Sequence, residues 1–186
     1  MLVFLVSSAS LRLSALLTVG ITGAAALCVW RRLPGPARAA VSYRVSVGAR
    51  AGLLGTLAYD ASRYLVVELG ALSIQPFEAI RLFGELLVGP GAPLWLALVV
   101  GVAFHACNGI GLAIAFTLLL GGRDWRTGIV YACGLEAVML AFYPNWLRVE
   151  ALGEFTTVSL LAHVVYGVTV AETARRRLRV GPDASA

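Results

Sequence analysis

The chain has 186 residues, of which 59% are hydrophobic and only 13% are charged, and its formal net charge is +5. Soluble domains contain about 45–50% apolar and about 25% charged residues, so this composition excludes an ordinary water-soluble domain. We interpret residues 1–186 as a single all-helical integral membrane domain.

Apolar runs long enough to cross a bilayer, about 18–25 residues each, recur along the chain. The first follows Arg12 but has no convincing cleavage site after it, so we expect a retained helix and not a removed signal peptide. The sequence therefore predicts five transmembrane helices, at residues 13–30, 51–71, 93–120, 128–143 and 155–171.

A shorter amphipathic segment lies between the second and third spans, at residues 76–88. Pro76 suits the first turn of a helix. Phe77, Ile80 and Leu87 fall on one face, and the charged residues Glu78, Arg81 and Glu85 fall on another. This pattern predicts a helix that lies in the membrane interface on the outer side.

All fifteen basic residues are arginines, and their distribution predicts the topology. Eleven of them lie between spans one and two, between spans three and four, or after span five, whereas the opposite loops contain Arg81 and Arg148 beside several glutamates. The positive-inside rule then places the N-terminus outside and the C-terminus in the cytoplasm of a bacterial inner membrane. The basic C-terminal tail is interpreted as a topology anchor that attracts anionic lipid, so nucleic acid is disfavoured as a partner.

The three cysteines give no sign of a disulfide framework or a zinc motif. Cys28, Cys107 and Cys133 fall in three separate spans. We interpret them as small apolar packing residues.

An internal repeat relates spans two and three to spans four and five. "GLLGTLAYDA" (52–61) and "GIVYACGLEA" (128–137) each contain a glycine, seven residues, an acid and an alanine. In the helix that follows each of them, "FHACNG" (104–109) and "AHVVYG" (162–167) place a histidine four residues before a glycine. The chain is therefore predicted to contain a duplicated two-helix unit plus one extra N-terminal helix, and the two copies have the same orientation in the membrane.

Four ionisable side chains of the repeat share one depth. At a rise of about 1.5 Å per residue, Asp60, His105, Glu136 and His163 all lie within roughly one turn of the membrane midplane. Ionisable groups at this depth are costly and face the bundle interior or a watery cavity. We predict that the four helices converge there on a binding site or proton relay.

Span two contains a second charge, Arg63, one turn after Asp60. Asp or Arg at a helix centre costs about 2.5–3.5 kcal/mol to insert. The two side chains are expected to pair with each other, which lowers this cost.

Asn108 and Tyr166 complete the predicted site. Each lies three residues after a histidine, on the same helix face, and is expected to hold an imidazole nitrogen in one tautomer. A pseudo-twofold axis along the membrane normal would place Asp60 opposite Glu136 and His105 opposite His163. Those four residues would then also form a mixed nitrogen and oxygen ligand set for zinc, manganese or iron.

The phrases "HACNG" and "HVVYG" resemble those of small uncharacterised bacterial membrane proteins with four or five helices. These proteins contain H-x-x-N-G and H-x-x-Y-G phrases in their helices, and the resemblance covers residues 50–173. It implies a polytopic helical fold and transfers no activity.

Several functions remain open from the sequence. The first is a unit for ion- or proton-coupled binding or transport, since carboxylates and imidazoles at the midplane are typical of such sites. The second is a scaffold or assembly subunit, a homo-oligomer or part of a membrane complex, in which the polar groups only join helices. The third is a b-type haem protein with His105 and His163 as axial ligands. An enzyme is disfavoured, because no motif of a hydrolase, a nucleotide-binding loop or a haem-attachment site is present.

Overall fold

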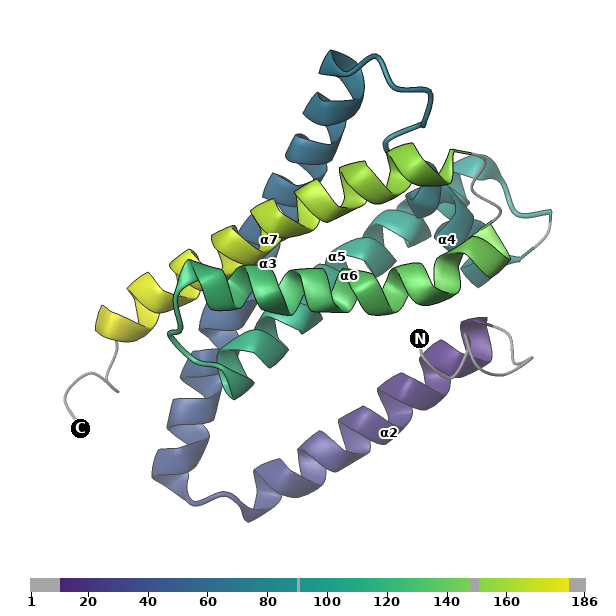
Figure 1. The fold of residues 1–186 in the computed structure, drawn as a ribbon. Coiled ribbons are helices and arrows are strands. Elements are labelled where there is room, and N and C mark those ends of the chain that lie inside the picture. Colours follow the sequence, from purple (N-terminus) through teal and green to yellow (C-terminus); the bar gives the residue numbers. More distant parts are fainter. Residues whose placement is uncertain (1–10, 90, 148–150, 181–186) are drawn as a thin grey trace.

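The computed structural model describes residues 11–89, 91–147 and 151–180, and all regular structure in this part of the chain is helical (Figure 1). The helices are α2 (Leu11–Arg32), α3 (Gly35–Leu69), α4 (Glu78–Val88), α5 (Leu94–Leu119), α6 (Trp125–Leu147) and α7 (Leu152–Val180). The predicted all-helical class is confirmed.

Each predicted apolar span coincides with a helix, but α3 is much longer than its span. It begins at Gly35, sixteen residues before the apolar run at 51–71, and Pro36 stands in its first turn, where a missing N–H costs nothing. Arg38 joins it to the preceding helix, because its Nε and Nη2 donate to the carbonyl oxygens of Trp30 and Arg31 at 3.0 Å each. Arg38, Arg44 and Arg50, which precede the second predicted span, therefore belong to one continuous helix with that span.

The start of α6 has a side-chain cap. Asp124 precedes α6, and its Oδ1 accepts hydrogen bonds from the backbone N–H and the hydroxyl of Thr127, at 3.1 and 3.0 Å. These bonds hold the pKa of the Asp124 carboxyl below its usual value. The interfacial helix predicted at 76–88 begins at Glu78 and ends at Val88.

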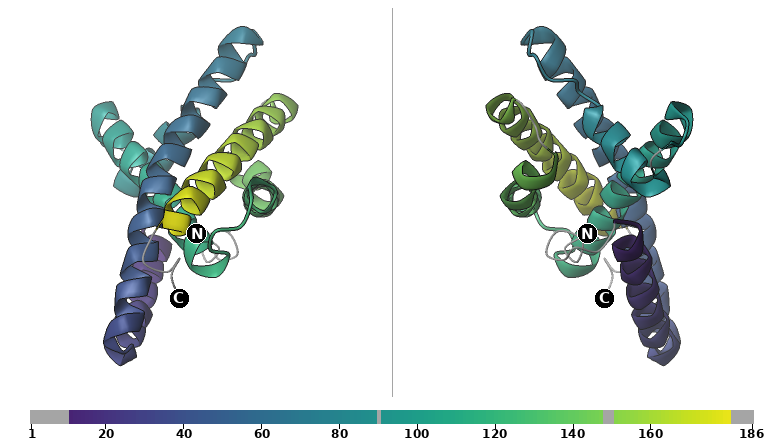
Figure 2. Two further views of the ribbon diagram at one scale, coloured as in Figure 1. Left: turned by 90° about the vertical axis from the view of Figure 1, so that its left-hand side faces the viewer. Right: turned by 90° about the vertical axis from the view of Figure 1, so that its right-hand side faces the viewer.

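The helices form a row in the order α5, α3, α7, α6. Helix α3 packs along both α5 and α7, and α6 packs along α7, so α3 and α7 are the two central helices (Figure 2). Helix α4 packs on α5, and α2 makes few contacts with the rest of the described chain, chiefly with α4 and through Arg38 of α3.

Glycines allow these helices to approach closely. A Cβ atom on Gly52 of α3 would meet the Cα of Ile110 on α5 at 2.6 Å, and one on Gly84 of α4 would overlap the backbone of Ala97 on α5. Between α6 and α7, a Cβ on either Gly128 or Gly167 would overlap the carbonyl of the other. Small residues at helix contacts are typical of packing inside membranes, where backbone proximity replaces the hydrophobic effect.

Arginine-rich segments from three parts of the chain meet at one end of the bundle. The Tyr43 hydroxyl in the first part of α3 donates to the carbonyl oxygen of Arg177 near the end of α7, at 2.7 Å. The loop after α5 approaches the same end, since Gly122 lies beside the Cα of Arg175. Arg148 and Glu150 of the opposite loop lie outside the described residues.

Among the described residues, two helices, α5 and α7, are long and apolar enough to cross a membrane by the criteria of length and composition. The prediction of five spans is therefore not confirmed. For α3 the physical reason is composition, because this helix contains arginines throughout its first half and both Asp60 and Arg63 in its second, which lowers its mean hydropathy.

Candidate functional site

A cavity of about 320 Å³ lies among α3, α4, α5, α6 and α7. All seven residues predicted as a binding site or proton relay line it. They are Asp60, Arg63, His105, Asn108, Glu136, His163 and Tyr166. The convergence arises because α3 and α7 cross centrally, with α5 and α6 on their outer sides.

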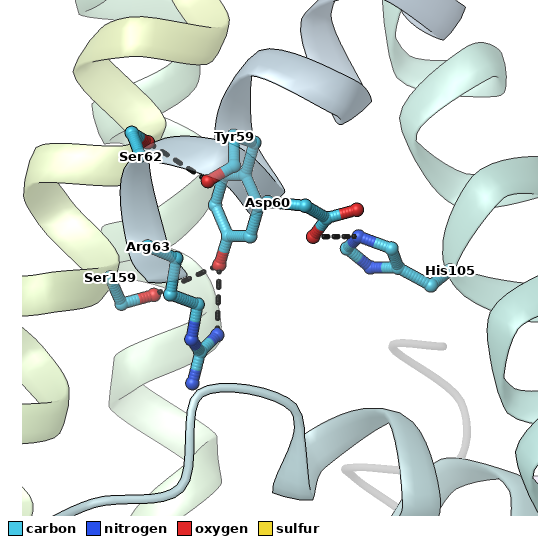
Figure 3. A network of polar contacts seen from close by, with 6 residues as sticks. All are labelled: Tyr59, Asp60, Ser62, Arg63, His105 and Ser159. Atoms are coloured by element: carbon cyan, nitrogen blue, oxygen red, sulfur yellow. Dashed lines mark hydrogen bonds and ion pairs between the residues drawn. The ribbon is translucent and has the colours of Figure 1, made fainter. Parts of the chain in front are cut away.

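The first acid and the first histidine contact each other across α3 and α5. Asp60 Oδ1 lies 3.0 Å from His105 Nε2 (Figure 3). The side chains are 27% and 30% exposed, so both remain accessible at the edge of the cavity.

The second acid and the second histidine meet across α6 and α7, deeper in the bundle. Glu136 Oε2 lies 3.4 Å from His163 Nδ1, and the Glu136 side chain has no exposed surface. His163 Nδ1 donates to the carbonyl oxygen of Ser159 at 2.9 Å, which fixes the proton on this nitrogen. Neither carboxylate oxygen of Glu136 makes a hydrogen bond of standard geometry with the described residues, although the Ser159 hydroxyl and the Arg63 guanidinium lie near enough to interact with the carboxylate.

The two halves of the chain make equivalent contacts. Gly52 packs against Gly109 and Ile110, eight residues before Asp60 reaches His105. Gly128 packs against Gly167, eight residues before Glu136 reaches His163. In each half, the helix with the acid therefore packs on the helix with the histidine through a glycine contact and an acid–histidine contact.

The predicted pseudo-twofold relation of the two halves is wrong. The acid helix α3 packs along the histidine helix α7 of the other half, whereas α5 and α6, which such an axis would bring together in the same way, do not pack along each other in their described residues. Asp60 contacts His105 and Glu136 approaches His163, and both contacts lie within one half. The facing of Asp60 with Glu136 and of His105 with His163 across the cavity stays a prediction. The Tyr59 ring contacts both imidazoles, with centroid distances of 5.8 Å to His105 and 5.0 Å to His163.

The predicted pairing of Asp60 with Arg63 is also wrong. Arg63 is 6% exposed, and its Nη1 donates to the Tyr59 hydroxyl at 3.1 Å (Figure 3). Its guanidinium lies 5.1 Å from the centroid of the Phe155 ring, a cation–π contact. The two side chains leave α3 in different directions, so Asp60 contacts α5 while Arg63 turns toward α7.

Sequence reasoning missed Tyr59 and Ser159, although both line the cavity. The Tyr59 hydroxyl lies 3.5 Å from Ser159 Oγ and connects it to Arg63. A usable signal was the Tyr59–Arg63 spacing, since side chains four residues apart share a helix face.

Asn108 and Tyr166 do not hold the imidazoles as predicted. The Tyr166 hydroxyl donates to the carbonyl oxygen of Gly109 at 2.6 Å and so joins α7 to α5. Asn108 is exposed. The backbone of Ser159 fixes the tautomer of His163 instead.

The residues present do not fit a metal or a haem. No group of three or more His, Cys, Asp or Glu side chains gathers closely enough to hold a metal ion in the described ranges, because the four predicted ligands meet only in pairs. An iron shared by His105 and His163 would need the space between their rings, where Tyr59 makes contact with both.

A family model described as "Family of unknown function (DUF6789)" matches residues 42–180. This range contains every residue that lines the cavity and excludes α2. No curated protein and no solved structure matches the chain.

Proposed function

We propose that this chain, which belongs to that family, is a small bacterial inner-membrane protein in which an interior site couples ligand binding or transport to a proton. The proposal has three parts: a membrane location, a duplicated architecture around the cavity, and a buried acid that exchanges a proton.

The exposure of the apolar helices supports the membrane location. Only 17% of the most apolar 18-residue stretch of α5 is buried inside the structure, whereas the core helix of a soluble protein is mostly buried. Leucines on the outward face of α3 are also exposed, with Leu53, Leu54 and Leu57 at 50%, 51% and 58%. Contiguous apolar surface of this kind is covered by lipid or by another protein.

The topology follows from the clustered arginines. We expect the basic end, formed by the start of α3, the loop before α6 and the end of α7, to face the cytoplasm. A reporter enzyme that works only in the cytoplasm should therefore be active when fused after Ala186. A reporter that works only in the periplasm should be inactive at the same position. The reverse pattern would contradict the topology.

The equivalent glycine and acid–histidine contacts in the two halves support a duplicated two-helix unit. Because the acid helix α3 packs on the histidine helix α7 of the other copy, the copies are related head to tail and share one cavity. The pairs differ in burial: Asp60 and His105 stand at the accessible edge, and Glu136 stands fully buried.

Glu136 carries the proposal. A carboxylate without exposed surface and without a hydrogen-bond partner among the described residues is stable only as the neutral acid or beside a bound cation. A residue that only joined helices would satisfy its oxygens across the contact, as Tyr166 does with Gly109. The geometry therefore favours a proton-exchanging group over interhelical glue.

Infrared spectroscopy of the purified protein tests this role without knowledge of the ligand. Wild-type protein at neutral pH should show the C=O stretching band of a neutral carboxylic acid that shifts in D2O, and Glu136→Gln should remove it. Asp60→Asn is the matched control and should leave the band in place, because Asp60 has an imidazole partner. A wild-type spectrum without the band, or a band that persists in Glu136→Gln, would reject the proposal.

A further inference from the structure

Two buried groups of opposite charge line the same cavity without neutralising each other. Arg63 is 6% exposed and its Nε has no hydrogen-bond partner in the described part of the chain, and the same is true of both oxygens of the fully buried Glu136. Each unsatisfied buried group costs about 1–3 kcal/mol, and more when it is charged. Both groups are therefore complementary to a ligand that they would contact in the cavity.

Arg63 and Glu136 form no direct ion pair and are linked through two side chains of the site. Tyr59 accepts a hydrogen bond from Arg63, and its ring stands against His163, which in turn approaches Glu136. Tyr59 and His163 thus connect a cationic group, Arg63 on α3, to an acidic group, Glu136 on α6. A ligand that satisfies both ends needs an anionic group and a hydrogen-bond-donating cationic group.

The remaining surface of the cavity is apolar. Most of it comes from the segment before α4, from α4 itself, and from α5 and α6. The main apolar residues are Phe77, Ile80, Phe83, Phe104, Leu135 and Met139. The volume of about 320 Å³ lies at the lower end of the roughly 300–1,000 Å³ of ligand pockets, so it suits a small molecule.

We propose that the cavity binds a small amphipathic zwitterion, with its carboxylate on Arg63, its primary ammonium on Glu136 and its apolar chain between α4 and α5. This inference rests on the proposed function and names its ligand class. The ammonium takes the place of the Glu136 proton: the carboxyl O–H bond breaks, the proton leaves to solvent, and the carboxylate pairs with the ammonium. One proton is released to solvent for each ligand bound, so the net charge of the buried site falls from +1, with Arg63 charged and Glu136 neutral, to zero, with both groups paired to the zwitterion.

Isothermal titration calorimetry of the full chain in detergent tests the ligand class with three probes of equal chain length. These are 2-aminooctanoate, octanoate, which lacks the ammonium, and octylamine, which lacks the carboxylate. The zwitterion should bind at least about tenfold more tightly than either of the others, because octanoate can pair only with Arg63 and octylamine only with Glu136, whereas the zwitterion forms both ion pairs. Titration in two buffers of different ionisation enthalpy should give about one proton released per zwitterion bound.

Variants assign the two ends of the site. Glu136→Gln should abolish proton release and remove the advantage of the zwitterion over octanoate. Arg63→Gln should remove its advantage over octylamine and keep proton release, whereas Arg63→Lys, which retains the charge, should keep part of that advantage. Glu172→Gln, at the arginine-rich end where Glu172 pairs with Arg175, is the control and should change neither quantity.

The outcomes separate this inference from the proposed function. Failure of the zwitterion to bind, equal binding of a singly charged probe, or binding without proton release would overturn the ligand class. The infrared result for Glu136 would be unaffected by any of these, since it needs no ligand. Absence of the infrared band from the wild-type spectrum would instead contradict both the proposed function and the ligand class.

Discussion

Replacing Gly167 by leucine should abolish the folded bundle. A Cβ atom at this position would overlap the carbonyl of Gly128 on α6, and the Cβ of Ala132 lies 3.0 Å away. The obstacle is backbone, which cannot rotate aside as a side chain can, so α6 and α7 would have to separate. We expect a loss of at least about 3 kcal/mol, measured as the yield of monodisperse protein and the midpoint of thermal unfolding in detergent.

The same chain offers a matched control for this prediction. Gly134 lies on α6, and a Cβ there would meet nothing within 4 Å. Gly134→Leu should change the free energy of unfolding by no more than about 0.5 kcal/mol. If Gly167→Leu folded as well as this control, the close contact of α6 with α7 would be wrong, and the position of His163 beside Glu136 would be in doubt with it.

The residues of the candidate site could be predicted from sequence because insertion energy depends on depth. Asp60, His105, Glu136 and His163 are expensive in an apolar run, so their common depth indicated a common interior place. The structure brings all four to one cavity.

The pairing of these residues could not be predicted in the same way. The depth of a residue in an apolar run predicts its level along the membrane normal. It does not predict the direction in which the side chain leaves the helix, or which helix lies beside it. Placing His105 on Asp60 requires the order α5, α3, α7, α6, and that order depends on glycine contacts such as that of Gly52 with Ile110. The sequence repeat is compatible with a twofold or a head-to-tail arrangement, and only packing distinguishes them.

The start of α3 was missed for a related reason. Apolar runs predict where a helix contacts lipid, whereas helix formation requires only residues without strong breakers. Residues 37–50 contain no proline and only one glycine, so the helix continues through the arginines to Pro36. Tyr59 was missed because an aromatic residue in an apolar span is usually packing, and its contact with both imidazoles depends on the tertiary arrangement.

Replacing Glu136 by leucine should raise the stability of the protein, although it removes the residue on which the proposed function depends. The side chain is fully buried, and neither oxygen has a hydrogen-bond partner among the described residues, so leucine removes an unsatisfied polar group and fills similar space. The gain should be about 1–3 kcal/mol, seen as a rise of roughly 2–10 °C in the thermal midpoint. Functional sites often contain such unfavourable groups, and their removal stabilises the fold at the expense of activity.

Asp60→Leu is the comparison variant for this prediction, because its stability should change in the opposite direction. Asp60 Oδ1 contacts His105 Nε2 at 3.0 Å, so its loss leaves an imidazole without its partner and should lower stability by about 1 kcal/mol. Two acids of the same repeat, at the same depth, should therefore change stability in opposite directions. A scaffold in which both acids only join helices would lose stability from either substitution. A fall in the midpoint for Glu136→Leu as large as that for Asp60→Leu would favour the scaffold and count against a proton-exchanging acid at Glu136.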